Sequence, residues 1–127
     1  MNYVIDRKPS IASHELMTMI NNIRNCFQFS YMESIMEISE ILDEMLKKIP
    51  RERDYNAVFE KVSKLLMEKC SYDVRPLDLR FRFTLFMQEE FDAIPKEQWK
   101  VNDSAWIAEK EQKAKEKLLN WIEQEIV

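Results

Sequence analysis

The chain contains no glycine among its 127 residues, and this absence constrains the fold more than any other feature. An average chain of this length would carry about nine glycines, at a usual frequency near 7%. Glycine reaches positive φ at no steric cost, and tight β-hairpin turns usually depend on it. Helices joined by short turns need positive φ less often. The absence of glycine therefore predicts an all-α fold.

Several functions are excluded for the same reason. A phosphate-binding P-loop, a dinucleotide-binding fingerprint and the nucleophile elbow of α/β-hydrolases all contain glycines that their tight turns require. The net charge of −4 disfavours nonspecific binding to nucleic acid or to an anionic membrane, and it favours a basic partner.

The length fits one domain, residues 1–127, which can bury a core without help from disulfides or metal ions. Two cysteines are too few for a disulfide framework. The first residues lack the apolar core of a signal peptide, and no run approaches the ~18 apolar residues of a membrane span. We therefore expect a cytoplasmic protein with reduced thiols.

The segment 30–49 has the clearest amphipathic pattern in the chain. Placed at 100° per residue, its apolar side chains fall on one face. They are Tyr31, Ile35, Ile38, Leu42, Met45, Leu46 and Ile49. An earlier apolar stripe, from Leu16 to Phe27, predicts a helix that begins near Ile11.

The connection between these two stripes is ambiguous. Ser30 and Glu33 are spaced as in a capping box, which favours a new helix start at this point. The apolar stripe nevertheless continues almost unbroken from Phe27 to Ile35 with no intervening proline, which favours one long, bent helix. We interpret 11–49 as two helices and keep the single helix as the alternative.

Prolines and capping residues divide the remainder of the chain. Pro50 ends the helix over 30–49, because the residue before a proline is disfavoured in the α region. Asp54 is a good N-cap for a helix that ends near Cys70. Asn102 or Asp103 can cap a last helix, which runs nearly to the end of the chain.

The middle of that last helix is strongly charged. Glu109–Lys113 and Glu111–Lys115 are spaced i,i+4, and each pair contributes a few tenths of a kcal/mol to the helix. We expect this part to project into water. Because lysines alternate with glutamates here, a phosphate-binding surface would be weakened, and we expect no nucleic-acid partner.

The segment 77–87 fits two structures. Leu77, Leu79, Phe81, Phe83 and Leu85 alternate with polar residues, which is a strand pattern. In a helix, Leu79 and Phe83 would share one face while the other three share the opposite face. The only strand partner is the weak segment Tyr3-Val4-Ile5, so we favour a helix over 77–94. Apolar on two sides, it is expected to be the buried central helix of a compact bundle of about five helices, with the last helix packed across it.

An acidic row lies opposite the apolar stripe of 30–49. It consists of Glu33, Glu37, Glu40 and Glu44, which fall on one side of the helix. Like charges at i,i+4 cost the helix a few tenths of a kcal/mol per pair. The row is either the solvated face of an acidic protein or an anionic surface that steers a basic partner into contact.

Residues that carry catalysis or hold metals are sparse. His14 is the only histidine, so neither the Glu-x-x-His pairs of di-iron bundles nor the zinc motif His-Glu-x-x-His can be completed. Cys26 and Cys70 lie late in their predicted helices, where the helix dipole disfavours a thiolate. We therefore expect no enzymatic activity, no cofactor and no metal site.

These observations favour a non-catalytic protein-binding module. The most specific form of this hypothesis is a small acidic inhibitor, an immunity protein or antitoxin, that neutralises a basic toxin or nuclease by direct binding. The acidic row would bind the partner, together with Trp99, which stands in a predicted turn between charged residues and can anchor an interface. Two alternatives are a structural or regulatory homo-oligomer and a small-ligand carrier with a site in the bundle interior.

Overall fold

Four α-helices and two short 3-10 helices make up the part of the chain that the computed structural model describes. The backbone is described for residues 9–126, and the side chains for residues 14–19 and 31–126. The elements are α1 (Pro9–Lys47), η1 (Pro50–Glu52), α2 (Tyr55–Cys70), α3 (Pro76–Asp92), η2 (Lys96–Gln98) and α4 (Ser104–Ile126). The all-α prediction is confirmed, with no strand between residues 9 and 126; Tyr3-Val4-Ile5 lies outside the described residues.

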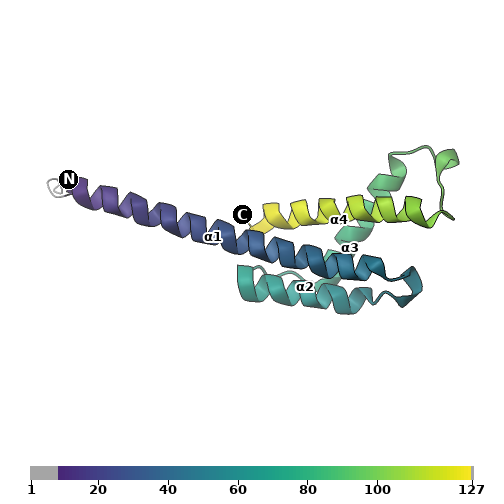
Figure 1. Ribbon diagram of the computed structural model, residues 1–127, viewed down its shortest axis with the longest axis horizontal. Helices are drawn as coiled ribbons and strands as arrows, with labels where there is room; N and C mark the ends of the chain where they lie inside the picture. The colour runs from purple at the N-terminus through teal and green to yellow at the C-terminus, as the bar shows by residue number, and fades with distance from the viewer. Residues whose placement is uncertain (1–8, 127) are drawn as a thin grey trace.

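The helices form a bundle in which α1 and α3 lie on opposite sides (Figure 1). α1 packs between α2 and α4, and both of these helices pack in turn against α3. α3 crosses behind the other three at a steep inclination (Figure 1). The expected packing of the last helix across the segment 77–94 is thus confirmed.

The core lies where these four helices meet. Its buried members repeat at helical spacing, so that each helix contributes one apolar stripe. They are Ile38, Leu42 and Met45 from α1, Phe59, Val62 and Leu66 from α2, Leu79 and Phe83 from α3, and Ala114, Leu118 and Ile122 from α4, with Val74 from the α2–α3 link. Burying one large apolar side chain of this kind contributes about 1.5–3 kcal/mol.

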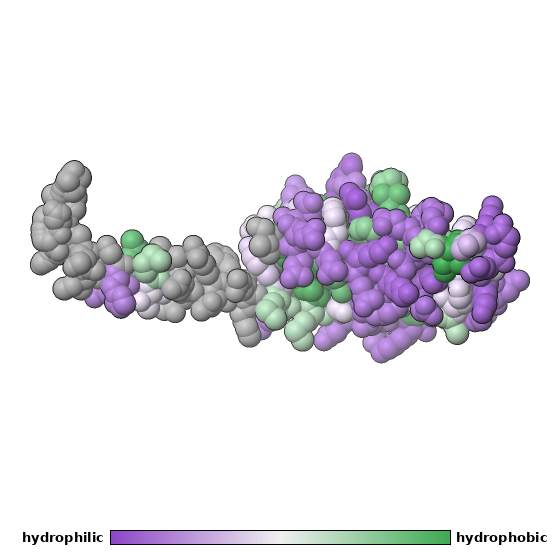
Figure 2. Space-filling view, turned by 90° about the horizontal axis from the view of Figure 1, so that it is seen from above, coloured by the Kyte–Doolittle hydropathy of each residue, from purple (hydrophilic) through white to green (hydrophobic). Residues whose placement is uncertain are grey.

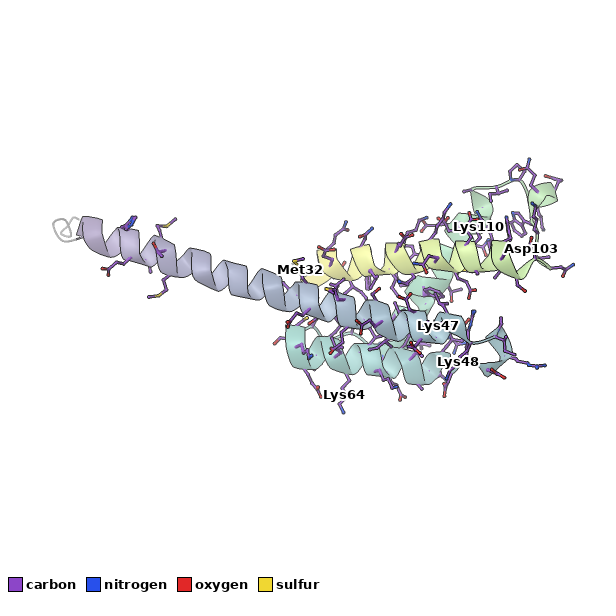
Figure 3. The ribbon with its side chains drawn as sticks, in the orientation of Figure 1. Met32, Lys47, Lys48, Lys64, Asp103 and Lys110 are labelled. Atoms are coloured by element: carbon purple, nitrogen blue, oxygen red, sulfur yellow. The ribbon has the colours of Figure 1, made fainter. Side chains whose placement is uncertain are left out.

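The prediction of two helices between residues 11 and 49 is wrong. α1 is one helix of 39 residues, about 58 Å long at 1.5 Å per residue. The capping-box pattern at Ser30 does not interrupt it, because no proline or glycine breaks the backbone hydrogen bonds there. Met32 lies where α1 enters the bundle, beside the C-terminal end of α4, and the part of α1 before it projects away (Figures 1 and 3).

The segment over 77–94 is a helix, as favoured, but it is not the buried centre of the bundle. Leu79 and Phe83 are buried against α2 and α4, whereas Leu77 is 68% exposed and Phe81 is 62% exposed. Leu85 is also exposed. α3 is covered on one face only, because α1 lies on the far side of the bundle. Its second apolar face therefore points to solvent.

The ends of the helices show how the chain turns without glycine. Asp54 accepts a hydrogen bond from the amide of Ala57, and Asp103 accepts from the amides of Ala105 and Trp106, so both predicted N-caps are confirmed. At the end of α2, Ser71 adopts the left-handed conformation with φ 51°, and the amide of Tyr72 donates to the carbonyl of Leu66. This position usually carries glycine, because a Cβ atom is strained there.

Replacing Ser71 by glycine should stabilise the protein. The substitution removes the strain of a left-handed serine, worth about 1–2 kcal/mol, and loses part of that gain to the greater freedom of the unfolded chain. We expect a net increase of about 0.5–1 kcal/mol in the free energy of unfolding, measured by urea denaturation. Asp73→Gly is the matched control: its φ is not positive, so it should destabilise. If Ser71→Gly destabilises equally, the left-handed turn is not present in solution.

Candidate functional site

The acidic row of α1 lies on the helix side that faces away from the core. Glu33, Glu40 and Glu44 are exposed and Glu37 is half-buried. Glu37 forms an ion pair at 3.0 Å with Lys69 of α2, and Glu44 forms one at 3.0 Å with Lys47 on its own helix. Among the described residues, no ion pair involves Glu33 or Glu40. The structure thus brings the four carboxylates together on one helix and partly neutralises two of them.

Trp99 occupies the link between α3 and α4, and it is half-buried. Its indole Nε1 donates hydrogen bonds to the carbonyls of Phe91, at 2.9 Å, and Ile94, at 3.0 Å. Its ring packs on that of Phe91, with the centroids 5.2 Å apart. These contacts fasten the link to the end of α3, where backbone carbonyls lack partners within the helix. Trp99 therefore has a role in the fold, with part of its ring left accessible.

The prediction that the charged middle of α4 projects into water is wrong for its inward side, although Glu109, Lys113 and Glu116 are exposed as expected. Lys110, Glu111 and Lys115 are each 5–6% exposed. Glu111 pairs with Arg53 rather than with Lys115, and Lys115 pairs at 2.5 Å with Asp43 of α1. The outward pair Glu109–Lys113 is present as expected, at 3.6 Å. Glu111 and Lys115 thus reach residues far away in the sequence, whereas Lys110 pairs at 3.8 Å with the adjacent Glu109.

Arg53 is the centre of this polar contact. Its Nε donates to the carbonyl of Lys48 and its Nη2 donates to that of Leu46, so it satisfies the free carbonyls at the end of α1. Its Nη1 donates to Glu111 and to the hydroxyl of Tyr55. Burial alone would lower the pKa of Arg53, but the hydrogen bonds that Arg53 donates to Tyr55 and Glu111, with the charge of Glu111, outweigh burial and raise it. One charged side chain therefore connects α1, α2 and α4.

A small hollow of about 160 Å³ lies beside this contact, lined by Tyr55, Arg80, Phe83 and Glu111 among others. Ligand pockets usually enclose about 300–1,000 Å³. The Glu111 carboxylate is occupied by Arg53, so it is not a free acid or base for catalysis. This hollow does not support the interpretation as a ligand carrier.

Sequence reasoning missed Arg53 and Glu111, although a signal was present. The buried stripe of α4 runs through Ala114, Leu118 and Ile122, and Glu111 occupies the next position of the same stripe. A charged residue within an apolar stripe indicates either a buried ion pair or a functional group. The partner could not be identified, because it lies 58 residues away in the sequence.

Comparison with known protein families, with curated proteins and with solved structures finds no match. Between residues 9 and 126, no helix is both long enough and apolar enough to cross a membrane. Among the side chains described, no group of three or more histidine, cysteine or acidic residues is arranged to hold a metal ion.

Removing one partner of the Arg53–Glu111 pair should destabilise the fold strongly. Glu111→Gln leaves a buried guanidinium without its counter-ion, and breaking a buried pair in this way costs about 3–5 kcal/mol. Glu68→Gln, at the exposed pair with Lys64, is the matched control and should cost less than about 0.5 kcal/mol. Urea denaturation measures both. The double variant Arg53→Met/Glu111→Leu should recover most of the loss; if Glu111→Gln costs no more than the control, the pair is not formed in solution.

Proposed function

We propose that this protein is a non-catalytic binding module, and specifically a small acidic inhibitor of the immunity-protein or antitoxin type. It would neutralise a basic toxin or nuclease by direct contact. The observation that carries the proposal is the acidic row of α1. Its carboxylates stand on a rigid helix that is anchored in the core by Ile38, Leu42 and Met45, so the partner meets charges whose positions are already fixed.

The electrostatics favour fast association with a basic surface. Glu33 and Glu40 have no cation to neutralise them among the described side chains, and the whole chain carries a net charge of −4. Complementary charge on two surfaces raises the association rate and is screened by salt. An inhibitor that must intercept a toxin benefits from this rate. The immunity or antitoxin role itself rests on these charges and not on a shared motif.

The first test is affinity capture from a lysate of the source cell, at low and at high salt. A basic partner should be recovered in stoichiometric amount at low salt and lost at high salt, because exposed charges are screened. The charge-reversal variant Glu33→Lys/Glu40→Lys should weaken the complex by about tenfold or more. Glu116→Lys/Glu123→Lys, which makes the same change on exposed positions of α4, is the control. The purified partner's toxic or nuclease activity should then fall as the protein is added.

If the Glu33→Lys/Glu40→Lys variant recovers the partner as well as the wild-type protein does, the acidic row is only a solvated face. Recovery of a partner whose activity the protein does not alter would leave a binding module but contradict the role of inhibitor.

A second candidate, self-association, is favoured by the part of α1 before Met32. Leu16, Met17 and Met19 are 54–57% exposed there, and none of the other helices between residues 9 and 126 lies beside this part of α1 (Figures 1 and 2). Between residues 9 and 32 the sequence holds only two formal charges, Glu15 and Arg24. Depletion of charge is typical of the centre of protein interfaces.

Helix propensity also favours self-association through this part of α1. Many residues of this part favour caps and turns over helix interiors, namely Ser10, Ser13, His14, Thr18, Asn21, Asn22 and Asn25. Such a segment becomes helical mainly through packing against another surface. The same segment of a second copy can supply that surface.

If α1 segments pair, Leu16→Glu/Met19→Glu should dissociate the oligomer. Burying two unpaired carboxylates costs more than about 1.4 kcal/mol, so the dissociation constant should rise more than tenfold. Analytical ultracentrifugation measures the change. Thr18→Glu is the control, because residue 18 points to the opposite side of the helix. A wild-type protein that is monomeric at micromolar concentration would contradict this candidate.

A further inference from the structure

The uncovered face of α3 is the strongest unexplained feature of the bundle. Leu77, Phe81 and Leu85 stand at i, i+4 and i+8, so their side chains form one continuous apolar stripe, which we call the α3 stripe. Phe81, at its centre, is 62% exposed. Single exposed apolar residues are ordinary, but an aligned row of three on a well-anchored helix indicates a docking surface.

Two arginines border the α3 stripe, one on each side. Arg80 lies over the ring of Tyr55 with its Cζ 5.5 Å from the centroid, and its Nη1 donates to Asn56 at 3.0 Å. Arg82 lies over the ring of Trp121 at 4.7 Å. Both guanidinium groups are therefore held in place before any partner arrives, so little conformational entropy is lost when they bind one.

Neither arginine has a carboxylate partner within the described part of the chain, although the chain as a whole carries more acidic than basic residues. Other charges nearby are paired among themselves: Arg75 forms two hydrogen bonds with Asp78, and Lys117 is shared by two carboxylates, Glu89 and Glu90. Asp73, also on the rim, is unpaired among the described residues. Glu125 of α4, whose charge acts on the nearby Tyr72, is also unpaired among the described residues. Arg80 and Arg82 are nevertheless the unpaired charges on either side of Phe81 itself.

A hollow of about 310 Å³ adjoins the α3 stripe and is lined by Tyr72, Phe81, Arg82 and Trp121, among others. It lies on the side of Arg82, next to the C-terminal part of α4. A hollow of this size can receive one or two large side chains of a partner. Pockets filled by such anchors carry much of the affinity at interfaces.

We propose that the α3 stripe binds an acidic amphipathic helix of a partner protein. The apolar side of that helix would cover Leu77, Phe81 and Leu85, and carboxylates on its two flanks would meet Arg80 and Arg82. Apolar contact gives affinity in this mode of helix recognition, and the flanking charges select the partner and its direction. This surface is separate from the acidic row of α1, and the proposal does not depend on the proposed function.

A second copy of this chain fits the stripe less well. If two α3 helices paired antiparallel about a two-fold axis through Phe81, each arginine would approach its own copy, because both lie one residue from the centre. Two such like-charge contacts would oppose the apolar gain. The charges therefore favour an acidic partner over self-association.

The test uses a synthetic helical peptide with leucines at i, i+4 and i+8 and glutamates at the flanking positions. A matched peptide carries lysines in place of the glutamates. Fluorescence anisotropy of the labelled peptides is measured with the full chain at physiological salt, where the Debye length of about 8 Å restricts the comparison to local charges. The glutamate peptide should bind at least about tenfold more tightly than the lysine peptide.

Three variants locate the binding. Phe81→Ser should raise the dissociation constant of the glutamate peptide about tenfold or more. The variant protein should fold normally, because Phe81 is mostly exposed. Arg80→Gln/Arg82→Gln should remove the preference for the glutamate peptide. Val101→Ser, at an apolar residue that is 51% exposed on the α3–α4 link, is the control and should change neither.

Equal binding of the two peptides, or binding that Phe81→Ser leaves unchanged, would overturn the proposal. An oligomer of the free protein that Phe81→Ser dissociates would also overturn it, since a second copy would then cover the stripe. Glu33→Lys/Glu40→Lys should leave peptide binding unchanged. This variant therefore distinguishes a failure of the α3 proposal from a failure of the proposal that the acidic row of α1 binds a basic partner.

Discussion

The arrangement of the bundle depends on charges buried between α4 and the first half of the chain. The side chains of Arg53 and Glu111 are both nearly inaccessible to solvent, and the attraction between their charges offsets the cost of desolvating them. Apolar residues in their place could stabilise the fold as well, but they could not choose one alignment of α4, because apolar contacts are not directional. The pair, together with Asp43–Lys115, fixes which turn of α4 faces the end of α1.

The second constraint is the unequal length of the helices. α1 has 39 residues and its neighbours α2 and α4 have 16 and 23, so the neighbours can cover only part of it. The apolar stripe of α1 nevertheless continues in sequence beyond the bundle. α3 is short enough to be covered along its whole length, but it is apolar on two faces and packs against the bundle through only one of them. The part of α1 before Met32 and the α3 stripe are both left uncovered, because four helices of these lengths cannot enclose all their apolar faces.

The sequence predicted most of the local structure and little of the long-range contact. The caps at Asp54 and Asp103 placed the starts of α2 and α4 within a residue or two, and Pro50 placed the end of α1 within a few residues, because these signals act locally. Two of the errors have one cause. The exposure of Phe81 and the burial of Glu111 both depend on which other helix lies opposite, and single-chain periodicity does not contain that information. The error at Ser30 is different: the capping-box pattern was given more weight than the absence of proline and glycine around it. The acidic row was found because it lies on one helix, whereas the arginine rim of α3 uses rings from α2 and α4.

The two proposed binding surfaces differ in charge and lie on opposite sides of the bundle. The acidic row of α1 carries unpaired carboxylates, and the rim of the α3 stripe carries unpaired guanidinium groups. Had the two sets been adjacent, they would have paired with each other, as Glu37 does with Lys69. α2 and α4 hold α1 and α3 apart, and this separation leaves both sets of charges unpaired. The same packing that leaves α1 and α3 partly uncovered thus keeps unpaired carboxylates on one side and unpaired guanidinium groups on the other, which is why the two proposals assign partners of opposite charge to them.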